Sequence, residues 1–255
     1  MNGEPDSAVF NDAVVVVTGA AGGLGRVLAE RFVALKSRVV AVDQIARDAA
    51  DGNSIQWIVQ DLSNERGVRR VVDDVTRLHH TVEILINAAG LFLPDVGCEG
   101  ADATLEKLWR GNVSSAVNVT LGLQSLLAAG RNPLVVNIAS TDAIVASAGQ
   151  SCEIGVAHDV LYATTKGALV SFTRALAMAW ARHRIRVNAI CPTIFESPMT
   201  ADLLSVRGKR AELESHIPLG RICSTQDIAD AVVAMYQLKM TTGHVLPVDG
   251  GYLCQ

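Results

Sequence analysis

Residues 14–25 read VVVVTGAAGGLG, and this stretch decides the fold that the sequence predicts. Its four valines are typical of a buried strand, and the spacing of Leu24, Leu28, Phe32 and Leu35 then predicts a helix. Glycines at the turn between them permit backbone angles closed to other residues and let the main chain approach a pyrophosphate at the helix N-terminus. The order of strand, glycine-rich turn and helix predicts a dinucleotide site, with a tight turn that binds no ligand as the plainer alternative.

The same alternation continues along the chain. Short β-branched runs predict seven strands, at residues 14–18, 38–43, 55–60, 83–87, 134–139, 185–190 and 244–248. Apolar periodicity predicts helices between them, over residues 24–35, 65–78, 105–129, 162–182 and 225–238. Such βα units predict the α/β class: a doubly wound Rossmann fold with a parallel sheet of about seven strands and helices on both faces. No repeat or linker divides the chain, so we expect residues 1–255 to form one dinucleotide-binding and catalytic domain.

Composition narrows the class of protein. Of 255 residues, 49% are hydrophobic and 19% are charged, which is enough apolar material for a large core. The formal net charge of −4 shows no basic excess, so we expect neither nucleic acid nor a membrane as partner. Without an apolar run that could cross a bilayer or a signal-peptide pattern, we expect a cytoplasmic protein. The five cysteines form no C-x-x-C pair and the histidines are not grouped, so we expect reduced thiols and no metal.

One acidic residue ends the second predicted strand. Asp43 is expected at the carboxyl edge of the sheet beside the glycine turn, where a carboxylate accepts hydrogen bonds from the adenosine ribose hydroxyls. Its charge repels a 2′-phosphate, and neither Gln44 nor the turn before Arg26 offers a cation to hold one. The sequence therefore predicts NAD rather than NADP, unless Asp43 is an ordinary turn residue.

Further motifs follow in order, at residues 61–62, 87–90, 136–140, 162–166 and 186–192. With the glycine spacing, they resemble the short-chain dehydrogenase/reductase family of the NAD-preferring Tyr-x-x-x-Lys type, from Val14 to Gly251. Ala88 replaces the second Asn of that family's Asn-Asn-Ala-Gly segment. The resemblance implies a cofactor site formed by Gly19, Gly23, Leu24, Gly25, Asp43, Asp61, Leu62, Asn87, Ala88, Gly90, Tyr162, Lys166, Pro192, Ile194 and Ser197.

The residues themselves indicate the chemistry. Tyr162 and Lys166 are four apart in a helical stretch, so they share a face. A phenol normally titrates near pH ~10, but an ammonium and a positive nicotinamide ring favour the phenolate and make it a usable base. Ser140 can orient the substrate oxygen by a hydrogen bond. By resemblance, Lys166 also holds the nicotinamide ribose, and Asn112 is the fourth catalytic residue, which holds a water of the proton relay.

Three departures from the family pattern bear on function. Thr193 replaces the usual Gly after Pro192, and Ser197 replaces a common Thr at the position that contacts the carboxamide. Residues 141–161 form an unusually long connection between Ser140 and Tyr162, with Gln150, Cys152, Glu153, His158 and Asp159 near the expected pocket mouth. This extended loop suits substrate recognition, a subunit contact or a solvated surface loop equally well.

A second variable region, residues 199–217, corresponds to the family's substrate lid and carries Arg207, Lys209 and Arg210. A basic lid suits an acidic substrate, but such charges more often solvate a loop, and Glu212 and Glu214 lie close by.

The function that the sequence predicts is interconversion of a secondary alcohol and a ketone by an NAD-dependent oxidoreductase. Two alternatives stay open: a 3-oxoacyl carrier-protein reductase and a dinucleotide-sensing regulator without catalytic activity. Besides a small alcohol or ketone, the expected partner is a second copy of the chain. The resemblance implies a homodimer or homotetramer that packs through the helices predicted at 105–129 and 162–182.

Overall fold

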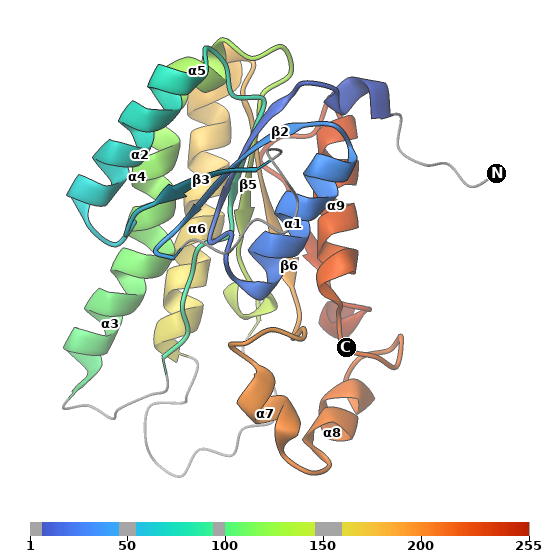
Figure 1. Ribbon diagram of the computed structural model, residues 1–255. Helices are drawn as coiled ribbons and strands as arrows, with labels where there is room; N and C mark the ends of the chain where they lie inside the picture. Colours follow the sequence, from blue (N-terminus) through green and yellow to red (C-terminus); the bar gives the residue numbers. More distant parts are fainter. Residues whose placement is uncertain (1–6, 46–54, 94–99, 146–159, 255) are drawn as a thin grey trace.

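A computed structural model describes residues 7–45, 55–93, 100–145 and 160–254 (Figure 1). Its centre is a parallel sheet of seven strands in the order β3-β2-β1-β4-β5-β6-β7. The strands are β1 (Val14–Thr18), β2 (Arg38–Asp43), β3 (Ile55–Val59), β4 (Ile84–Asn87), β5 (Leu134–Ile138), β6 (Arg186–Pro192) and β7 (Val245–Val248). The doubly wound α/β fold is confirmed, and each predicted strand lies within two residues of its expected bounds.

Helices cover both faces of the sheet. They are α1 (Gly23–Ala34), α2 (Glu65–Leu78), α3 (Ala101–Trp109), α4 (Ser115–Gly122), α5 (Gln124–Ala128), α6 (Val160–Trp180), α7 (Ala201–Ser205), α8 (Lys209–Ser215) and α9 (Thr225–Gln237). Helices α1 and α9 lie together on one face, whereas α2, α4 and α6 cover the other (Figure 1). No helix within the described ranges is long and apolar enough to cross a membrane.

The valines of β1 show how sequence alternation builds two cores. Val15 and Val17 face the core under α1 and α9, and Val14 and Val16 face the core under α2, α4 and α6. Successive side chains of a strand point to opposite faces, so a central strand covered on both sides is apolar throughout. The continuous valine run thus reflects burial of both faces.

The prediction of one helix over residues 105–129 was wrong in detail. The helical stretch begins earlier, at Ala101, and a π-helical turn at Arg110–Ser114 separates α3 from α4. A second break lies at Leu123, between α4 and α5. A π turn places one more residue in the turn than an α-helix does, and such turns are frequent at functional sites. Apolar periodicity does not reveal it, because the flanking helices keep their buried faces.

Candidate active site

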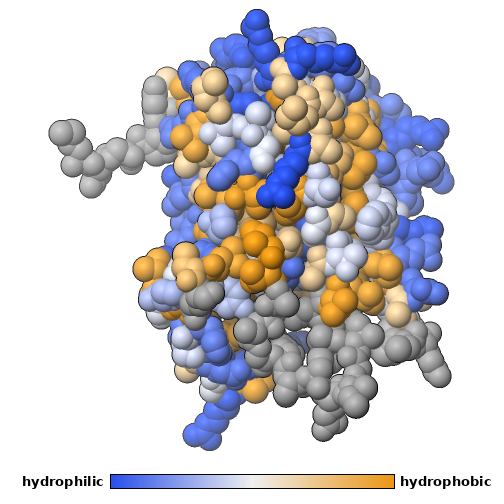
Figure 2. All heavy atoms as spheres, turned by 180° about the vertical axis from the view of Figure 1, so that it is seen from behind, coloured by the Kyte–Doolittle hydropathy of each residue, from blue (hydrophilic) through white to orange (hydrophobic). Residues whose placement is uncertain are grey.

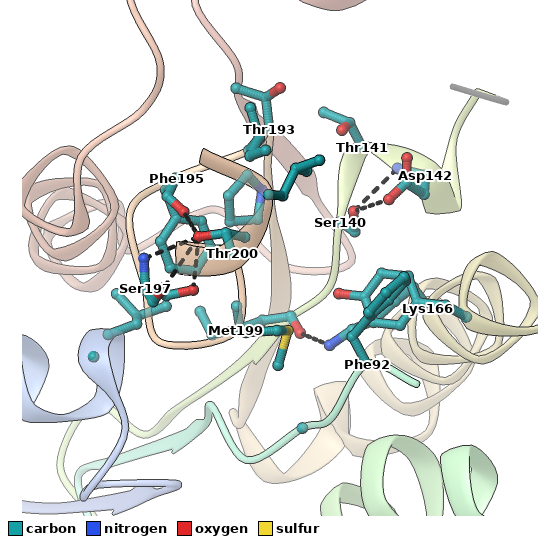
Figure 3. Close-up of a pocket in the computed structure, with 18 of the residues that line it drawn as sticks. Phe92, Ser140, Thr141, Asp142, Lys166, Thr193, Phe195, Ser197, Met199 and Thr200 are labelled. Carbon is teal, nitrogen blue, oxygen red and sulfur yellow. Dashed lines mark hydrogen bonds between the residues drawn. The ribbon is translucent and has the colours of Figure 1, made fainter. Parts of the chain in front are cut away.

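A cavity of about 700 Å³ opens at the carboxyl edge of the sheet (Figure 3). Strands β1 and β4 are neighbours in the sheet although β2 and β3 separate them in the chain. Ligands of open α/β sheets bind outside such a switch point. The cavity brings together most of the predicted site: Gly19, Gly23, Leu24, Gly25, Asp43, Ala88, Gly90, Ser140, Tyr162, Lys166, Pro192, Ile194 and Ser197.

The glycine turn after β1 is held at very close range to the end of β4. Gly19 has a positive φ of 69°, and a Cβ atom there would lie 2.7 Å from Cα of Ala89. A Cβ atom on Gly25 would lie 2.1 Å from the carbonyl oxygen of Gly19. Because no larger residue fits either place, the turn forms a bare backbone cradle at the N-terminus of α1. This cradle and its helix N-terminus fit a pyrophosphate.

Asp43 connects the end of β2 to this cradle. Its carboxylate accepts hydrogen bonds from the backbone N–H groups of Ala21 at 2.9 Å and Gln44 at 2.7 Å. The side chain thus supports the glycine turn, as the plainer interpretation expected, and it also lines the cavity. A carboxylate accepts about four hydrogen bonds, so structural support and ribose binding are compatible.

Tyr162 and Lys166 lie one turn apart near the start of α6, and both line the cavity. The Lys166 Nζ atom is 5.5 Å from the centre of the Tyr162 ring, and it donates a hydrogen bond of 2.9 Å to the carbonyl oxygen of Ile138 at the end of β5. Ser140 follows two residues later along the chain. Its position brings a hydroxyl to the same cavity as the phenol and the amine.

Burial governs the charge of Lys166. The side chain is buried, and desolvation lowers the pKa of its ammonium to about 8, with Cys191 and Asp142 acting in the opposite direction. Burial likewise raises the pKa of the neighbouring Cys191 thiol to about 11. The amine is therefore poised near neutral pH, whereas the thiol stays protonated and unreactive.

Asn112 lies in the π turn and clamps the loop after β4. Its amide oxygen accepts from the N–H of Leu91 at 2.7 Å, and its nitrogen donates to the carbonyl oxygen of Leu91 at 3.0 Å and to Thr165 Oγ1 at 3.0 Å. These contacts join the loop after β4 to α6, directly before Lys166. The side chain thus positions neighbouring groups, and its role in a water relay stays a prediction.

Four predicted site residues do not line the cavity: Asp61, Leu62, Asn87 and Asn112. Asp61 accepts hydrogen bonds from the N–H and the hydroxyl of Ser63, at 2.8 and 2.9 Å, and the backbone hydrogen bond lowers the pKa of its carboxyl. Asn87 is buried within the sheet and donates to Asn137 at 2.8 Å and Thr120 at 2.9 Å. Their contacts with the cofactor stay predictions, and in this structure they support the strand ends.

The region expected to be a lid, residues 199–217, contains α7 and α8 and borders the cavity through Met199, Leu203, Lys209, Glu212, Leu213, His216 and Ile217. Two of its three Lys and Arg side chains are paired with acids: Lys209 with Glu212 at 2.7 Å, and Arg210 with Glu196 and Glu214. The pairs offset most of the basic charge that the sequence showed, and they weaken the argument for an acidic substrate.

Several lining residues were missed by sequence reasoning. Phe92 follows the Asn-Ala-Ala-Gly segment, and its ring meets the Tyr162 ring edge to face with 5.4 Å between centres. Thr141 and Asp142 follow Ser140 and line the cavity with it, and Tyr252 reaches it from the C-terminal end. In the sequence, only their closeness to the recognised motifs could have indicated that these residues line the site. The expected pocket-mouth residues Gln150, Cys152, Glu153, His158 and Asp159 lie outside the described residues.

Comparisons with known proteins match most of the chain. The model of a family described as enoyl-(acyl carrier protein) reductase matches residues 19–253. The NAD-dependent glycerol dehydrogenase of Listeria innocua is 30% identical over 95% of this chain and 94% of its own. The mouse (Mus musculus) 3-oxoacyl-[acyl-carrier-protein] reductase is 29% identical over 94% of this chain and 98% of its own. Among solved structures, Pseudomonas aeruginosa RhlG in an active-site complex with NADP has a TM-score of 0.84 and 28% identity, covering 95% and 98% of the two chains.

The buried amine makes stability depend on pH in a predictable direction. The pKa of Lys166 is about 8 in the fold against 10.5 for the free side chain, so the unfolded chain binds more protons between these values. The free energy of unfolding should therefore rise with pH in this window, and the full cost of burial applies below pH 8. Between pH 8 and 10.5, the free energy of unfolding of the ligand-free wild type should rise by up to about 3 kcal/mol relative to that of Lys166→Met.

Urea denaturation of the two proteins across this range measures that difference. Lys166→Met also loses the hydrogen bond to Ile138, which lowers the free energy of unfolding by the same amount at every pH. Only the change of the stability difference with pH therefore reports the titration of the amine. A difference that stays constant from pH 7 to 10.5 would contradict the assignment of a buried titrating amine.

Proposed function

The chain belongs to the short-chain dehydrogenase/reductase family, and on this basis we propose that it is an NAD-dependent oxidoreductase that interconverts a secondary alcohol and a ketone. One observation carries the proposal. Ser140, Tyr162 and Lys166 line the same cavity as the glycine turn and Asp43. The candidate acid/base, Tyr162, and the glycine turn that suits a dinucleotide therefore line one cavity.

The residues present fit a nicotinamide dinucleotide. The glycine cradle and the N-terminus of α1 suit its pyrophosphate, Asp43 suits the adenosine ribose, and Lys166 suits the nicotinamide ribose. Pro192, Ile194 and Ser197 also line the cavity, and the segment after β6 approaches the glycine turn closely, since a Cβ on Gly23 would lie 3.0 Å from Pro198. When bound, the cofactor supplies the hydride acceptor or donor.

The protein supplies the proton chemistry. When the substrate binds, the Ser140 hydroxyl turns its single proton from Asp142 to the substrate oxygen and orients that oxygen toward Tyr162. In oxidation, the Tyr162 phenolate accepts the alcohol proton, and a positive charge at Lys166 favours this form of the base by Coulomb attraction. In reduction, the Tyr162 phenol donates the proton. Phe92 packs edge to face on the Tyr162 ring and holds its orientation.

A 3-oxoacyl carrier-protein reductase is the rival function, and the mouse relative supports its consideration. Asp43 favours the dehydrogenase, because its carboxylate disfavours the 2′-phosphate of the cofactor that such reductases normally use. A dinucleotide-sensing regulator is less well supported, because Ser140, Tyr162 and Lys166 are retained together around one cavity. A cytoplasmic location stays a prediction.

The direct test is a panel of secondary alcohols and ketones assayed with NAD and with NADP, and followed by the absorbance of the reduced cofactor. Polyols, hydroxy acids, alicyclic alcohols and steroids belong in the panel, and a 3-oxoacyl thioester tests the rival. Turnover of alcohols with NAD supports the proposal. If only the thioester is turned over, and only with NADP, the result supports the reductase. If no combination of substrate and cofactor is turned over, both functions are contradicted.

The acid/base role predicts the behaviour of Tyr162→Phe. Loss of the phenolic hydroxyl should lower kcat by at least about 10²- to 10⁴-fold while NAD binding persists, since the ring and its packing remain. Tyr252→Phe is the matched control, because Tyr252 also lines the cavity but lies outside the proposed proton path. Steady-state kinetics and NAD titration separate the two effects. Near-normal turnover in Tyr162→Phe would falsify the mechanism.

Cofactor preference depends on Asp43. A hydrogen bond to a charged group contributes ~1.5–3 kcal/mol, so Asp43→Ala should weaken NAD binding by roughly one to two decades and narrow the discrimination against NADP. Asp43→Asn retains an acceptor for the N–H of Ala21 but removes the charge, so NADP exclusion should be relieved with less damage to the turn. Equal kcat/KM for the two cofactors in the wild type would show that Asp43 does not select between them.

We also propose a homodimer or homotetramer that packs through α3, α4 and α6. Trp109, Leu121 and Met178 on these helices are exposed. Figure 2, which views the molecule from behind, shows hydrophobic atoms gathered near the middle of that side of the molecule. Contiguous exposed apolar surface is typical of protein interfaces. Light scattering at micromolar concentration should give a mass of two or four chains, and a monomer would remove this proposal.

A further inference from the structure

A carboxylate lies beside the serine that receives the substrate oxygen. Asp142 belongs to a short 3-10 turn, Thr141–Ala143, which follows β5 and Ser140 directly. The residue is partly buried and lines the cavity. The proton-transfer scheme above uses Ser140, Tyr162 and Lys166 and gives Asp142 no role. A charged group at this place therefore needs an explanation of its own.

Asp142 and Ser140 form a compact pair. The Ser140 hydroxyl donates to Asp142 Oδ2 at 2.9 Å and accepts from the N–H of Asp142 at 3.2 Å (Figure 3). This pair therefore presents two oxygens at hydrogen-bond spacing. Two hydroxyls on neighbouring carbons of a gauche diol lie at the same kind of spacing. When the reacting oxygen of such a diol binds at Ser140, its second hydroxyl comes within reach of the carboxylate.

Polar side chains lie nearest to Asp142 in the cavity. Ser140, Thr141, Asp142 and Thr193 lie on one side of it in the close-up view, and Phe92 and Met199 lie on the other (Figure 3). Thr141 and Thr193 are both buried, so their hydroxyls belong to the interior of the site. The polar side suits a hydroxylated part of a substrate, and the apolar side suits its carbon skeleton.

The charge of Asp142 restricts what binds there. A carboxylate accepts hydrogen bonds at about four positions, so it has the capacity to bind more than one hydroxyl. It attracts a hydroxyl donor, offers nothing to a bare methylene, and repels a carboxylate or phosphate. The charge is also felt within the site, because Asp142 is among the groups that favour the ammonium form of Lys166.

We propose that Asp142 is a specificity-determining residue that accepts a hydrogen bond from a hydroxyl on the carbon next to the reacting carbinol. The substrate is then a vicinal diol or a larger polyol rather than a hydroxy acid or a simple alcohol. In oxidation, the carbinol C–H leaves as hydride to NAD, the carbinol O–H proton goes to Tyr162, and the neighbouring hydroxyl remains unchanged in the hydroxyketone product. This inference rests on the proposed alcohol dehydrogenase function.

Matched alcohols test the proposal. The wild type is assayed with NAD on 2,3-butanediol against 2-butanol, on 1,2-cyclohexanediol against cyclohexanol, and on 3-hydroxybutanoate as the anionic competitor. In at least one pair, kcat/KM for the diol should exceed that for the simple alcohol by about ten- to a hundred-fold. The preference should lie mainly in KM, because the second hydroxyl is bound alike in the ground and transition states.

Variants then assign the preference to Asp142. Asp142→Ala should bring the ratio of diol to simple alcohol close to one. Asp142→Asn keeps the size and an acceptor but removes the charge, so it should retain part of the ratio and admit 3-hydroxybutanoate better. Asp73→Ala, which removes an exposed carboxylate from α2, is the matched control and should keep the wild-type ratio. NAD titration of each variant checks that the cofactor site is intact.

The outcomes separate this inference from the function on which it rests. An unchanged ratio in Asp142→Ala, or a wild type that turns over simple alcohols as well as diols, overturns the role of Asp142 alone. An equal loss for every substrate in Asp142→Ala also overturns it, because the residue would then only position Ser140. Absence of turnover for all alcohols and ketones overturns both the function and the inference.

Discussion

The site depends on one close approach of backbone to backbone. Gly19, at positive φ, brings the turn after β1 so near to the end of β4 that a Cβ atom would lie 2.8 Å from the carbonyl oxygen of Ala88. Gly25 in turn packs against the carbonyl of Gly19. This contact sets the N-terminus of α1 beside the switch point of the sheet, where Gly23, Leu24 and Gly25 line the cavity. A side chain at either glycine would push the helix away and close the space for a pyrophosphate.

Near the glycine turn, hydrogen bonds between buried polar groups hold the side chains of the candidate site in position. Asn112 clamps Leu91 and Thr165, while Lys166 donates to Ile138 across from α6 to β5. The π turn lets Asn112 make these contacts from the middle of a helical stretch. Such contacts replace the water that an isolated amine or amide would have, and they hold the side chains without relying on a ligand. Burial of Lys166 costs stability and brings its titration close to neutral pH, a trade typical of functional sites.

The part of the cavity near Asp142 is built from different elements than the glycine turn and the buried polar groups. Its walls come from the turn after β5, the segment after β6 and the helices α7 and α8, all of which are connections rather than strands. Connections accept substitution more easily than a buried sheet does, so one fold serves many alcohols through them. Here the connections place Asp142 beside Ser140 and hydrophobic side chains opposite. In the proposed function, the substrate is therefore recognised by connections, whereas the cofactor is held by the strand ends and the glycine turn.

Local sequence determined most of the fold and the chemical groups. The valine run, the glycine turn, and the Tyr162 and Lys166 pair are short-range patterns with a direct physical meaning, so strands, cradle and base were predicted from them. Distances between distant segments depend on packing instead. That Asn87 donates to Asn137 and Thr120, that Asn112 reaches Thr165, and that Lys166 reaches the carbonyl oxygen of Ile138 was decided by tertiary structure. The physical reason is that a polar side chain bonds to whichever partner the fold brings within about 3 Å, and spacing along the chain does not contain that choice.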